Sequence, residues 1–245
     1  MSATPLPKRW PWLIRGFCRY VRRFLRKNFR ALRLSKESST LPSDGLPVLF
    51  VMNHPSWWDP MVGAALIDLL PEYSHYVAMD AATLKVYWVF RRLGFFGINM
   101  NTLAGARTFL RTGSAILADD CRALWVTAQG EFADVRKRPL ALKPGVGHLA
   151  ARLDRGWIVP IAVEYVFWNE RKPEALVRIG EPISLESGHQ PVFANASNTE
   201  TRAKARTPAK AWIERIEAVL TETLDALNAE AISRDASLFT PLIGK

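Results

Sequence analysis

The stretch VLFVMNHPSWWDP, residues 48–60, joins a short apolar run to a histidine and an aspartate that are separated by four residues. A short apolar run of this length, rich in branched side chains, is typical of a buried β-strand. The strand leads directly into Asn53 and His54. Pro55 then disfavours a helical conformation at His54 and suits the first turn of a helix that begins there. The stretch therefore predicts a strand, a turn and a helix, with the histidine at the carboxyl end of the strand.

His54 and Asp59 are the candidate catalytic pair of this stretch. Histidine acts as a general base near neutral pH, and a carboxylate that holds one ring nitrogen fixes the tautomer and stabilises the imidazolium. On a regular helix the two positions would lie about 140° apart, so the side chains meet only if the chain turns between them. We expect Asp59 to lie early in the helix and to lean back toward the strand. The alternative is an ordinary histidine at a strand end beside an ordinary N-terminal helix charge.

Strands and helices alternate along the rest of the chain. Strands are predicted at 75–79, 95–100, 123–128, 157–168 and 175–183, and helices at 61–70, 82–94, 103–120, 145–154 and 208–231. The polar stretch 35–47 is expected to be a linker, and the polar segment 186–207 an exposed loop. The alternation predicts an α/β layer architecture in which the strand ends face a common edge.

The positive charge of the chain lies at its N-terminus. The net charge is +10, but residues 1–36 hold 11 of the 33 lysines and arginines and no acid, so the other 22 basic and 23 acidic residues sum to −1. Placed on a helix, this arm has an apolar face and a basic face. The apolar face holds Ile14, Phe17, Val21, Phe24 and Leu25, and the basic face holds Arg15, Arg19, Arg22, Arg23, Arg26, Arg30 and Arg33.

Such an arm is typical of a helix that lies in a membrane interface, with Trp10, Trp12 and Tyr20 at the headgroup boundary and the cations on anionic lipids. The alternative is a basic helix packed on its own domain. Nucleic-acid binding is not expected, because the rest of the chain has no basic excess. No uncharged apolar run approaches the roughly 18 residues of a spanning helix, and arginines interrupt every possible signal-peptide core. We predict a peripheral protein on the cytoplasmic face of the inner membrane.

The two cysteines, Cys18 and Cys121, lie far apart in the sequence and share no metal-ligand spacing with the four histidines. Neither a disulfide framework nor a metal site is predicted, and a reducing compartment fits this usage. We expect an arm over residues 1–36 and a domain over residues 45–232.

Several motifs together resemble the glycerolipid acyltransferases of the lysophosphatidic acid acyltransferase type. The first motif of that family, N-H-x-x-x-x-D, is matched by Asn53, His54 and Asp59. Three further blocks follow in the family's order: LGFFGINM at 93–100, LWVTAQGEFADVRKRPLALKPGVGHLA at 124–150 and IVPIAVEY at 158–165. The resemblance covers roughly residues 45–185. It implies a single α/β domain like that of the glycerol-phosphate acyltransferases, with a mixed sheet flanked by helices.

The resemblance also implies an activity. The protein would transfer a fatty acyl group from a thioester, acyl-CoA or acyl-ACP, to a hydroxyl of a lysolipid or another lipid-like acceptor, with no cofactor and no covalent acyl-enzyme. His54 would be the base and Asp59 its orienter, and the absence of a G-x-S-x-G elbow agrees. Backbone N–H groups near Gly130 are expected to stabilise the oxyanion. The expected substrate-binding residues are Asn53, Trp57, Trp58, Gly94, Phe96, Met100, Gln129, Gly130, Glu131 and Lys143.

Two positions depart from the family's pattern. The second motif normally ends in an arginine that grips the acceptor's phosphate, whereas this chain has Met100, which cannot hold a phosphate. The third motif normally reads Glu-Gly-Thr-Arg, and this chain has Gln129, Gly130, Glu131 and Phe132. An acceptor without a phosphate is therefore expected.

Other features of the sequence leave alternatives open. The basic run Arg136, Lys137 and Arg138, with Lys143 downstream, either receives the phosphates or acidic surface of an acyl carrier or is a solvated surface. The aromatic residues around the motifs either line an acyl tunnel or fill the core; they are Trp57, Trp58, Trp88, Phe90, Phe95 and Phe96. A thioesterase that uses the same pair to activate water, and an inactive lipid-binding homologue, are the competing functions.

Overall fold

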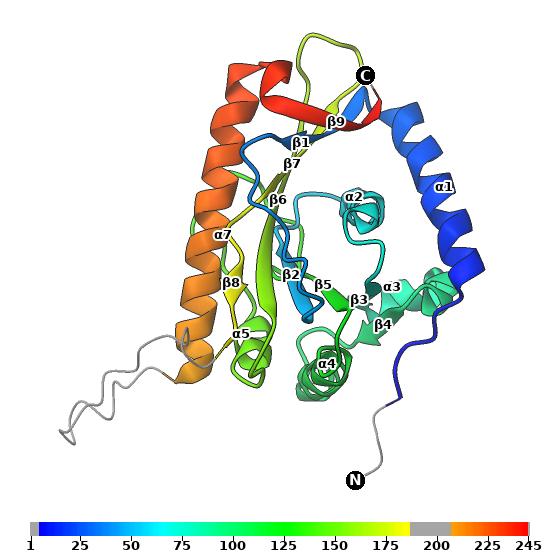
Figure 1. The fold of residues 1–245 in the computed structure, drawn as a ribbon, viewed down its shortest axis with the longest axis vertical. Coiled ribbons are helices and arrows are strands. Elements are labelled where there is room, and N and C mark those ends of the chain that lie inside the picture. The colour runs from blue at the N-terminus through cyan, green and yellow to red at the C-terminus, as the bar shows by residue number, and fades with distance from the viewer. Residues whose placement is uncertain (1–4, 187–206, 245) are drawn as a thin grey trace, which may run out of the picture.

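The computed structural model describes residues 5–186 and 207–244 and arranges them around one nine-stranded mixed sheet (Figure 1). The strand order is β4-β3-β5-β2-β6-β7-β1-β9, and β8 pairs with β6. The strands are β1 (Ala31–Ser35), β2 (Val48–Met52), β3 (Ser74–Asp80), β4 (Phe95–Ile98), β5 (Arg122–Thr127), β6 (Trp157–Val166), β7 (Glu174–Ile179), β8 (Ile183–Ser184) and β9 (Phe239–Gly244). The predicted α/β architecture with a mixed sheet is confirmed.

The half of the sheet that runs from β4 to β6 is parallel throughout. The other half is mixed, since β7 is antiparallel to β6, β1 is parallel to β7 and β9 is antiparallel to β1. Parallel strands end at the same edge of a sheet, where ligands bind in open α/β folds. Here that carboxyl edge gathers the segments that follow β2, β3, β4 and β5, together with the end of β6.

Helices cover both faces of the sheet, with α1 and α7 on opposite sides (Figure 1). One face is covered by α1 (Pro11–Asn28), α2 (Asp59–Leu66), η1 (Ile67–Leu69), α3 (Ala81–Val86) and η2 (Trp88–Arg92). The other is covered by α4 (Leu103–Ile116), α5 (Gly145–Ala150) and α7 (Pro208–Ser233), and η4 (Ala236–Leu238) leads into β9. Side chains of β2 alternate between the two interiors: Phe50 and Met52 face α1 and α2, whereas Leu49 and Val51 face α7.

The N-terminal arm differs from its prediction. The helix ends at Asn28, and the residues expected to extend it form β1 instead, between β7 and β9. Arg33, expected on a basic outer face, is 8% exposed and forms an ion pair with Glu174 at 3.0 Å. The apolar face of α1 packs on the domain: Val21 and Leu25 are buried against α2 and the sheet. The alternative of a helix packed on its own domain therefore describes this face.

Other boundaries also differ from the sequence prediction. The strand expected at 175–183 is split into β7 and β8, and β9 was not predicted at all. The helix predicted at 61–70 begins at Asp59 and ends at Leu66, and the segment from Pro55 to Trp58 is not part of it. The loop predicted at 186–207 lies almost entirely outside the described residues. Within the described parts of the chain, no helix is both long enough and apolar enough to cross a bilayer.

Candidate active site

The end of β2 is fixed to both neighbouring strands, and this places His54. Asn53, directly after β2, continues the pairing with β6 through its side chain: its amide donates to Val163 O at 2.9 Å, and its Oδ1 accepts from the Val163 N–H at 2.8 Å. On the other side, Gln129 Oε1 accepts from the His54 N–H at 2.8 Å. The His54 carbonyl accepts from the Ala133 N–H at 2.9 Å. The backbone of His54 is thus held from both sides.

His54 and Asp59 are in direct contact, as the turn at Pro55 predicts. His54 Nδ1 lies 2.6 Å from Asp59 Oδ2, which also accepts from the Ser56 N–H at 3.1 Å. Asp59 is the first residue of α2 and is fully buried. Its second oxygen, Oδ1, accepts from the Tyr165 hydroxyl at 2.7 Å. A carboxylate held in this way fixes Nδ1 as the protonated nitrogen and leaves Nε2 as the basic one.

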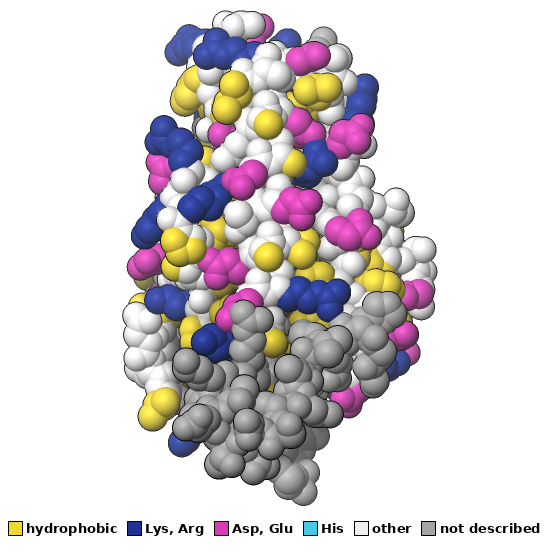
Figure 2. Space-filling view, turned by 90° about the vertical axis from the view of Figure 1, so that its left-hand side faces the viewer, with side chains coloured by type: hydrophobic (Ala, Val, Ile, Leu, Met, Phe, Trp, Pro, Cys, Tyr) yellow, Lys and Arg dark blue, Asp and Glu magenta, His cyan; other side chains and the backbone are white. Residues whose placement is uncertain are grey.

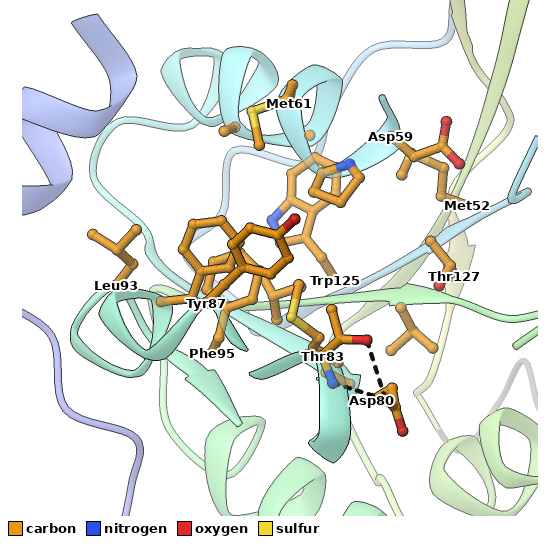
Figure 3. Close-up of a pocket in the computed structure, with 18 of the residues that line it drawn as sticks. Met52, Asp59, Met61, Asp80, Thr83, Tyr87, Leu93, Phe95, Trp125 and Thr127 are labelled. Atoms are coloured by element: carbon orange, nitrogen blue, oxygen red, sulfur yellow. Dashed lines mark hydrogen bonds between the residues drawn. The ribbon is translucent and has the colours of Figure 1, made fainter. Parts of the chain in front are cut away.

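A cavity of about 440 Å³ opens beside this pair and continues between the sheet and the helices that cover it. Figure 3 shows Asp59 and Thr127 on one side of it and Leu93, Tyr87 and Phe95 on the other, with Trp125 between them. Most of the side chains that line the cavity are apolar or aromatic. This volume lies within the roughly 300–1,000 Å³ typical of small-molecule sites.

Residues of α1 line part of this cavity, which the sequence did not predict. They are Ile14, Phe17, Cys18 and Tyr20. Phe17 meets Phe90 of η2 edge to face, with ring centroids 5.5 Å apart, and Arg92 of η2 lies over the Trp10 ring at 4.9 Å. The arm is therefore joined to the site rather than separate from it.

Five of the predicted site residues line the cavity: His54, Trp57, Asp59, Met100 and Gly130. Met100, in the place of the family's arginine, has its methyl carbon 2.9 Å from where a side chain at Gly130 would begin. Gly130 itself has a φ of +67°, which favours glycine. The second and third sequence motifs therefore meet at the carboxyl edge, close to His54.

Three predicted substrate-binding residues lie elsewhere. Trp58 packs against Phe24 and Phe29, with ring centroids 5.2 and 4.9 Å away, because α2 turns it toward α1. Phe96 is buried in the core on the α7 side, and its neighbour Phe95 lines the cavity instead. Gly94 is a packing position, since a Cβ there would lie 2.7 Å from the His75 carbonyl oxygen.

Asn53 and Gln129 are buried, and their side chains form hydrogen bonds with backbone groups of Val163 and His54. Gln129 holds its orientation by donating from Nε2 to Leu140 O at 3.1 Å. An amide N–H can donate this hydrogen bond, so the glutamine that replaces the family's glutamate has a suitable partner in the Leu140 carbonyl. Glu131 and Lys143 are exposed beside the cavity, and the Lys143 stem lies next to Gly130.

The basic run after β5 is largely neutralised. Arg136 pairs with Asp134 at 2.7 Å, and Arg138 pairs with Asp225 of α7. Lys137 and Lys143 form no ion pair with any residue that the structure describes. Among these four basic residues, Lys137 and Lys143 therefore remain the candidates for binding an acyl carrier.

The oxyanion donor expected at Gly130 is already engaged, because the Gly130 N–H donates to Thr127 O at 3.1 Å. Two further residues contact the His54–Asp59 pair and were not predicted from the sequence. Phe132 packs on the His54 ring at 4.6 Å between centroids and is 61% exposed. Tyr165 is the last residue of the fourth motif. The alternation of side chains along the predicted strand already places it on the same face as Val163.

A family model and a solved structure relate this chain to known proteins. A family model described as Acyltransferase matches residues 32–164, more than half of the 245 residues. A search of curated proteins found no match. The chain is similar to the crystal structure of the 1-acyl-sn-glycerophosphate (LPA) acyltransferase PlsC from Thermotoga maritima, at 16% identity and a TM-score of 0.55, over 89% of this chain and 80% of that one. At this identity the similarity shows the fold alone. By its family match over residues 32–164, the chain belongs to the Acyltransferase family.

Proposed function

We propose that the protein transfers a fatty acyl group from a thioester of coenzyme A or of acyl carrier protein to a hydroxyl of a lipid-like acceptor. The observation that carries this proposal is the apolar cavity that opens at the His54–Asp59 pair. An apolar cavity suits an acyl chain, and the pair at its mouth suits removal of a proton. His54 would be the base and Asp59 its orienter.

In the proposed reaction, His54 Nε2 takes the proton of the acceptor hydroxyl as its oxygen attacks the thioester carbonyl. The tetrahedral intermediate then collapses with loss of the carrier thiolate, which receives the proton from the imidazolium. The products are an ester and a free thiol, and no acyl-enzyme forms. Asp59 supports this cycle because a buried carboxylate stabilises the imidazolium that appears halfway.

The carrier would approach from the side of Lys143 and Lys137, whose cations form no ion pair with any described residue and can meet phosphates. Lys143 lies nearest to the reacting centre, since its stem is packed beside Gly130 at the cavity wall. We assign it to a phosphate of the carrier or to the oxyanion. Glu131 and Phe132, whose backbone N–H groups follow Gly130 along the chain, are the further oxyanion donors that this placement suggests.

The acceptor would lack the phosphate that lysophosphatidic acid carries. Met100 occupies the position of the phosphate-binding arginine, and exposed aromatic side chains, Trp57 and Phe132, flank His54. Aromatic faces favour apolar surfaces and sugar-like rings over a dianionic phosphate. A neutral hydroxylated lipid, such as a glycolipid or a non-phosphate lysolipid, fits these walls.

The membrane surface would be the partner of the α1 side, at the cytoplasmic face of the inner membrane. Large aromatic side chains of α1 and η2 are exposed, among them Trp12 at 63% and Trp88 at 65%. The exposed arginines of α1 accompany them: Arg15, Arg19, Arg23 and Arg26. Amphipathic aromatic rings and arginines suit a headgroup layer that contains anionic lipids. Since α1 also lines the cavity, acyl chains would have a short path between the bilayer and the site.

The test uses the full chain on vesicles that contain anionic phospholipid. Release of free thiol from acyl-CoA and from acyl-ACP is measured with and without a panel of hydroxylated lipids. We expect thiol release that requires an acceptor, and a loss of about 10²–10⁴-fold in His54→Ala. His148→Ala is the matched control, because His148 is exposed on α5 and does not line the cavity.

Two outcomes would contradict the proposal. Thiol release at the full rate without any acceptor, with free fatty acid as the product, would identify a thioesterase. Vesicle binding without thioester consumption across the acceptor panel would identify an inactive lipid-binding homologue. Product analysis by mass spectrometry separates the two, and acceptors with and without a phosphate test the assignment drawn from Met100.

A further inference from the structure

Asp59 has two carboxylate oxygens, and different groups hold them. Oδ2 accepts from His54 Nδ1 at 2.6 Å and from the Ser56 N–H at 3.1 Å, whereas Oδ1 accepts from the Tyr165 hydroxyl at 2.7 Å. We propose that Tyr165 is a positioning residue of this site: its hydroxyl fixes the Asp59 carboxylate, which in turn orients the His54 imidazole. The kinetic consequence rests on the proposed acyl transfer, while the hydrogen-bond chain itself does not.

The sheet delivers Tyr165 to this position. Met52 at the end of β2 pairs with Ile161, and β6 continues to Val166, so β6 runs past the end of β2. In that extension the Asn53 side chain grips the backbone of Val163 on both its donor and its acceptor. Tyr165 lies two residues further on and therefore on the same face, toward α2. Asn53 thus fixes the strand that brings the Tyr165 phenol to Asp59.

The surroundings of Tyr165 restrict the position of its ring and keep its hydroxyl protonated. The ring packs against Phe29, with centroids 5.7 Å apart, and against the core beneath α1 and α2. Burial, followed by the nearby Asp59 charge, raises the pKa of Tyr165 well above its usual value. The phenol is therefore a hydrogen-bond donor to the carboxylate throughout the pH range in which such an enzyme works.

No other described side chain donates to Asp59 Oδ1. Because Asp59 is 0% exposed, bulk water has no direct access to replace the phenol. A buried carboxylate oxygen without a donor is costly, and the terminal torsion of an aspartate is broad enough to let the group turn. Without Tyr165, the carboxylate can turn and exchange its oxygens, and the imidazole loses its fixed orientation.

A purely structural role is the competing explanation, in which the hydroxyl merely ties β6 to α2. Tyr165→Phe removes the hydroxyl and keeps the ring. Tyr73→Phe is the matched control: Tyr73 is buried, whereas Tyr165 is half-buried, and the Tyr73 hydroxyl donates at 2.9 Å to Leu46 O, away from the cavity. Both variants lose one part-buried hydrogen bond of a phenol, so a structural role predicts a loss of stability in both and no selective loss of turnover.

The kinetic measurement compares kcat and KM of the two variants at a temperature at which both are folded. For Tyr165→Phe we expect kcat to fall by about 10–100-fold, because a small misplacement of a reacting group costs up to about 10²-fold, with KM for the thioester changed by less than about twofold. For Tyr73→Phe we expect kcat to be unchanged. Wild-type kcat in Tyr165→Phe, or an equal fall in both variants, would overturn the positioning role.

A spectroscopic measurement tests the same chain without any substrate. The proton on His54 Nδ1, in its short hydrogen bond to Asp59, should give a downfield NMR resonance that Asp59→Asn abolishes and thereby assigns. We expect Tyr165→Phe to shift or broaden this resonance and Tyr73→Phe to leave it unchanged. An unchanged resonance in folded Tyr165→Phe would refute the inference. If the wild type transferred no acyl group, only the proposed function would fail, and this resonance would still decide the role of Tyr165.

Discussion

The two faces of the sheet bury similar side chains but have different interiors. On the α7 side, Trp212, Leu220 and Leu224 are at most 2% exposed and lie in one continuous core with β2 and β6. On the α1 side, comparable apolar residues enclose the cavity of about 440 Å³. The helices that cover the two faces explain the difference. The filled face is spanned by α7, of 26 residues, with α4 and α5 beside it, whereas α2 and α3, of 8 and 6 residues, share the other face with α1.

A long helix packs its neighbouring turns into the sheet without interruption, while short helices that meet at loops leave space between their ends. The outer surfaces differ in the same way. Figure 2 shows basic and acidic side chains intermixed over the α7 side, whereas α1 exposes arginines and aromatic rings. One face is therefore a filled core and the other encloses the candidate site, and four variants with their controls test this division.

The largest effect is expected from Leu220→Ala on the filled face. Leu220 is 0% exposed, so its truncation leaves a void in a packed core and should lower the free energy of unfolding by about 2–5 kcal/mol. Urea denaturation measures this change. The control is Ile232→Ala on the same helix, where the side chain is 81% exposed and the change should be small. A loss of turnover in folded Leu220→Ala, with little loss of stability, would contradict the division.

The next effect concerns membrane binding by the α1 side. Each cation near an anionic surface contributes about 1 kcal/mol, so Arg19→Gln with Arg23→Gln should weaken vesicle binding by about 30-fold. Both arginines are exposed on α1. The matched pair on the other side is Arg152→Gln with Lys210→Gln, which should bind nearly as the wild type does. Equal weakening in both pairs would show that net charge, and not this face, governs binding; vesicle cosedimentation at fixed salt measures it.

Local features of this protein could be predicted from the sequence. The strand before His54, the turn at Pro55 and the contact with Asp59 all lie within about a dozen residues, where proline geometry and periodicity determine the outcome. The meeting of the second and third motifs at Met100 and Gly130 follows from the common edge of parallel strands.

Features that depend on distant partners could not be predicted in the same way. The segment Ala31–Ser35 continues the helical pattern of α1, yet it pairs with β9 from the far end of the chain, and this pairing makes it a strand. The prediction that Arg33 lies on an exposed basic face was wrong for the same reason, since its partner Glu174 lies 141 residues away. The cavity was also beyond prediction, because periodicity identifies apolar faces but not the space left between them.

A smaller effect is expected from Gly63→Leu in α2. Gly63 lines the cavity, and a Cβ there would meet only Trp125, at 4.0 Å. Replacing a helical glycine should stabilise the protein by about 0.5–1 kcal/mol, while the new side chain occupies the cavity. We expect kcat/KM for long-chain thioesters to fall by about tenfold, or about 1.4 kcal/mol, and for short-chain thioesters to fall less.

Gly16→Leu is the control for this substitution. Gly16 is exposed in α1, has nothing within 4 Å of its ideal Cβ and does not line the cavity. It should gain similar helix stability with no change in chain-length preference. Activity of Gly63→Leu that equals that of the wild type on every chain length would mean that acyl chains do not enter this space.

The smallest effect concerns two titrating groups, one on each face of the sheet. Burial raises the pKa of Glu164, on the α7 side of β6, from its ordinary 4.5 to about 7, with Arg136 opposing and Asp134 assisting. Burial lowers the pKa of His75, at the cavity wall, from 6.5 to about 4. The raised pKa of Glu164 stabilises the fold below about pH 4.5, and this stability is lost as the pH rises through 7. The lowered pKa of His75 acts oppositely: its stability is present above 6.5 and lost as the pH falls toward 4.

Because Glu164 and His75 change the stability in opposite directions over the same pH range, the pH dependence of wild-type stability cannot separate their contributions. The variant Glu164→Gln can separate them. The neutral amide removes only the carboxylate's slope, so the melting temperature of the variant relative to the wild type should be higher at pH 8 than at pH 5. The gain should be about 1 kcal/mol or less, since Glu164 is only partly buried and solvent screens its charge. A difference that is flat in pH, or larger at pH 5, would mean that Glu164 is ionised in the folded protein and that the filled face already accommodates its charge.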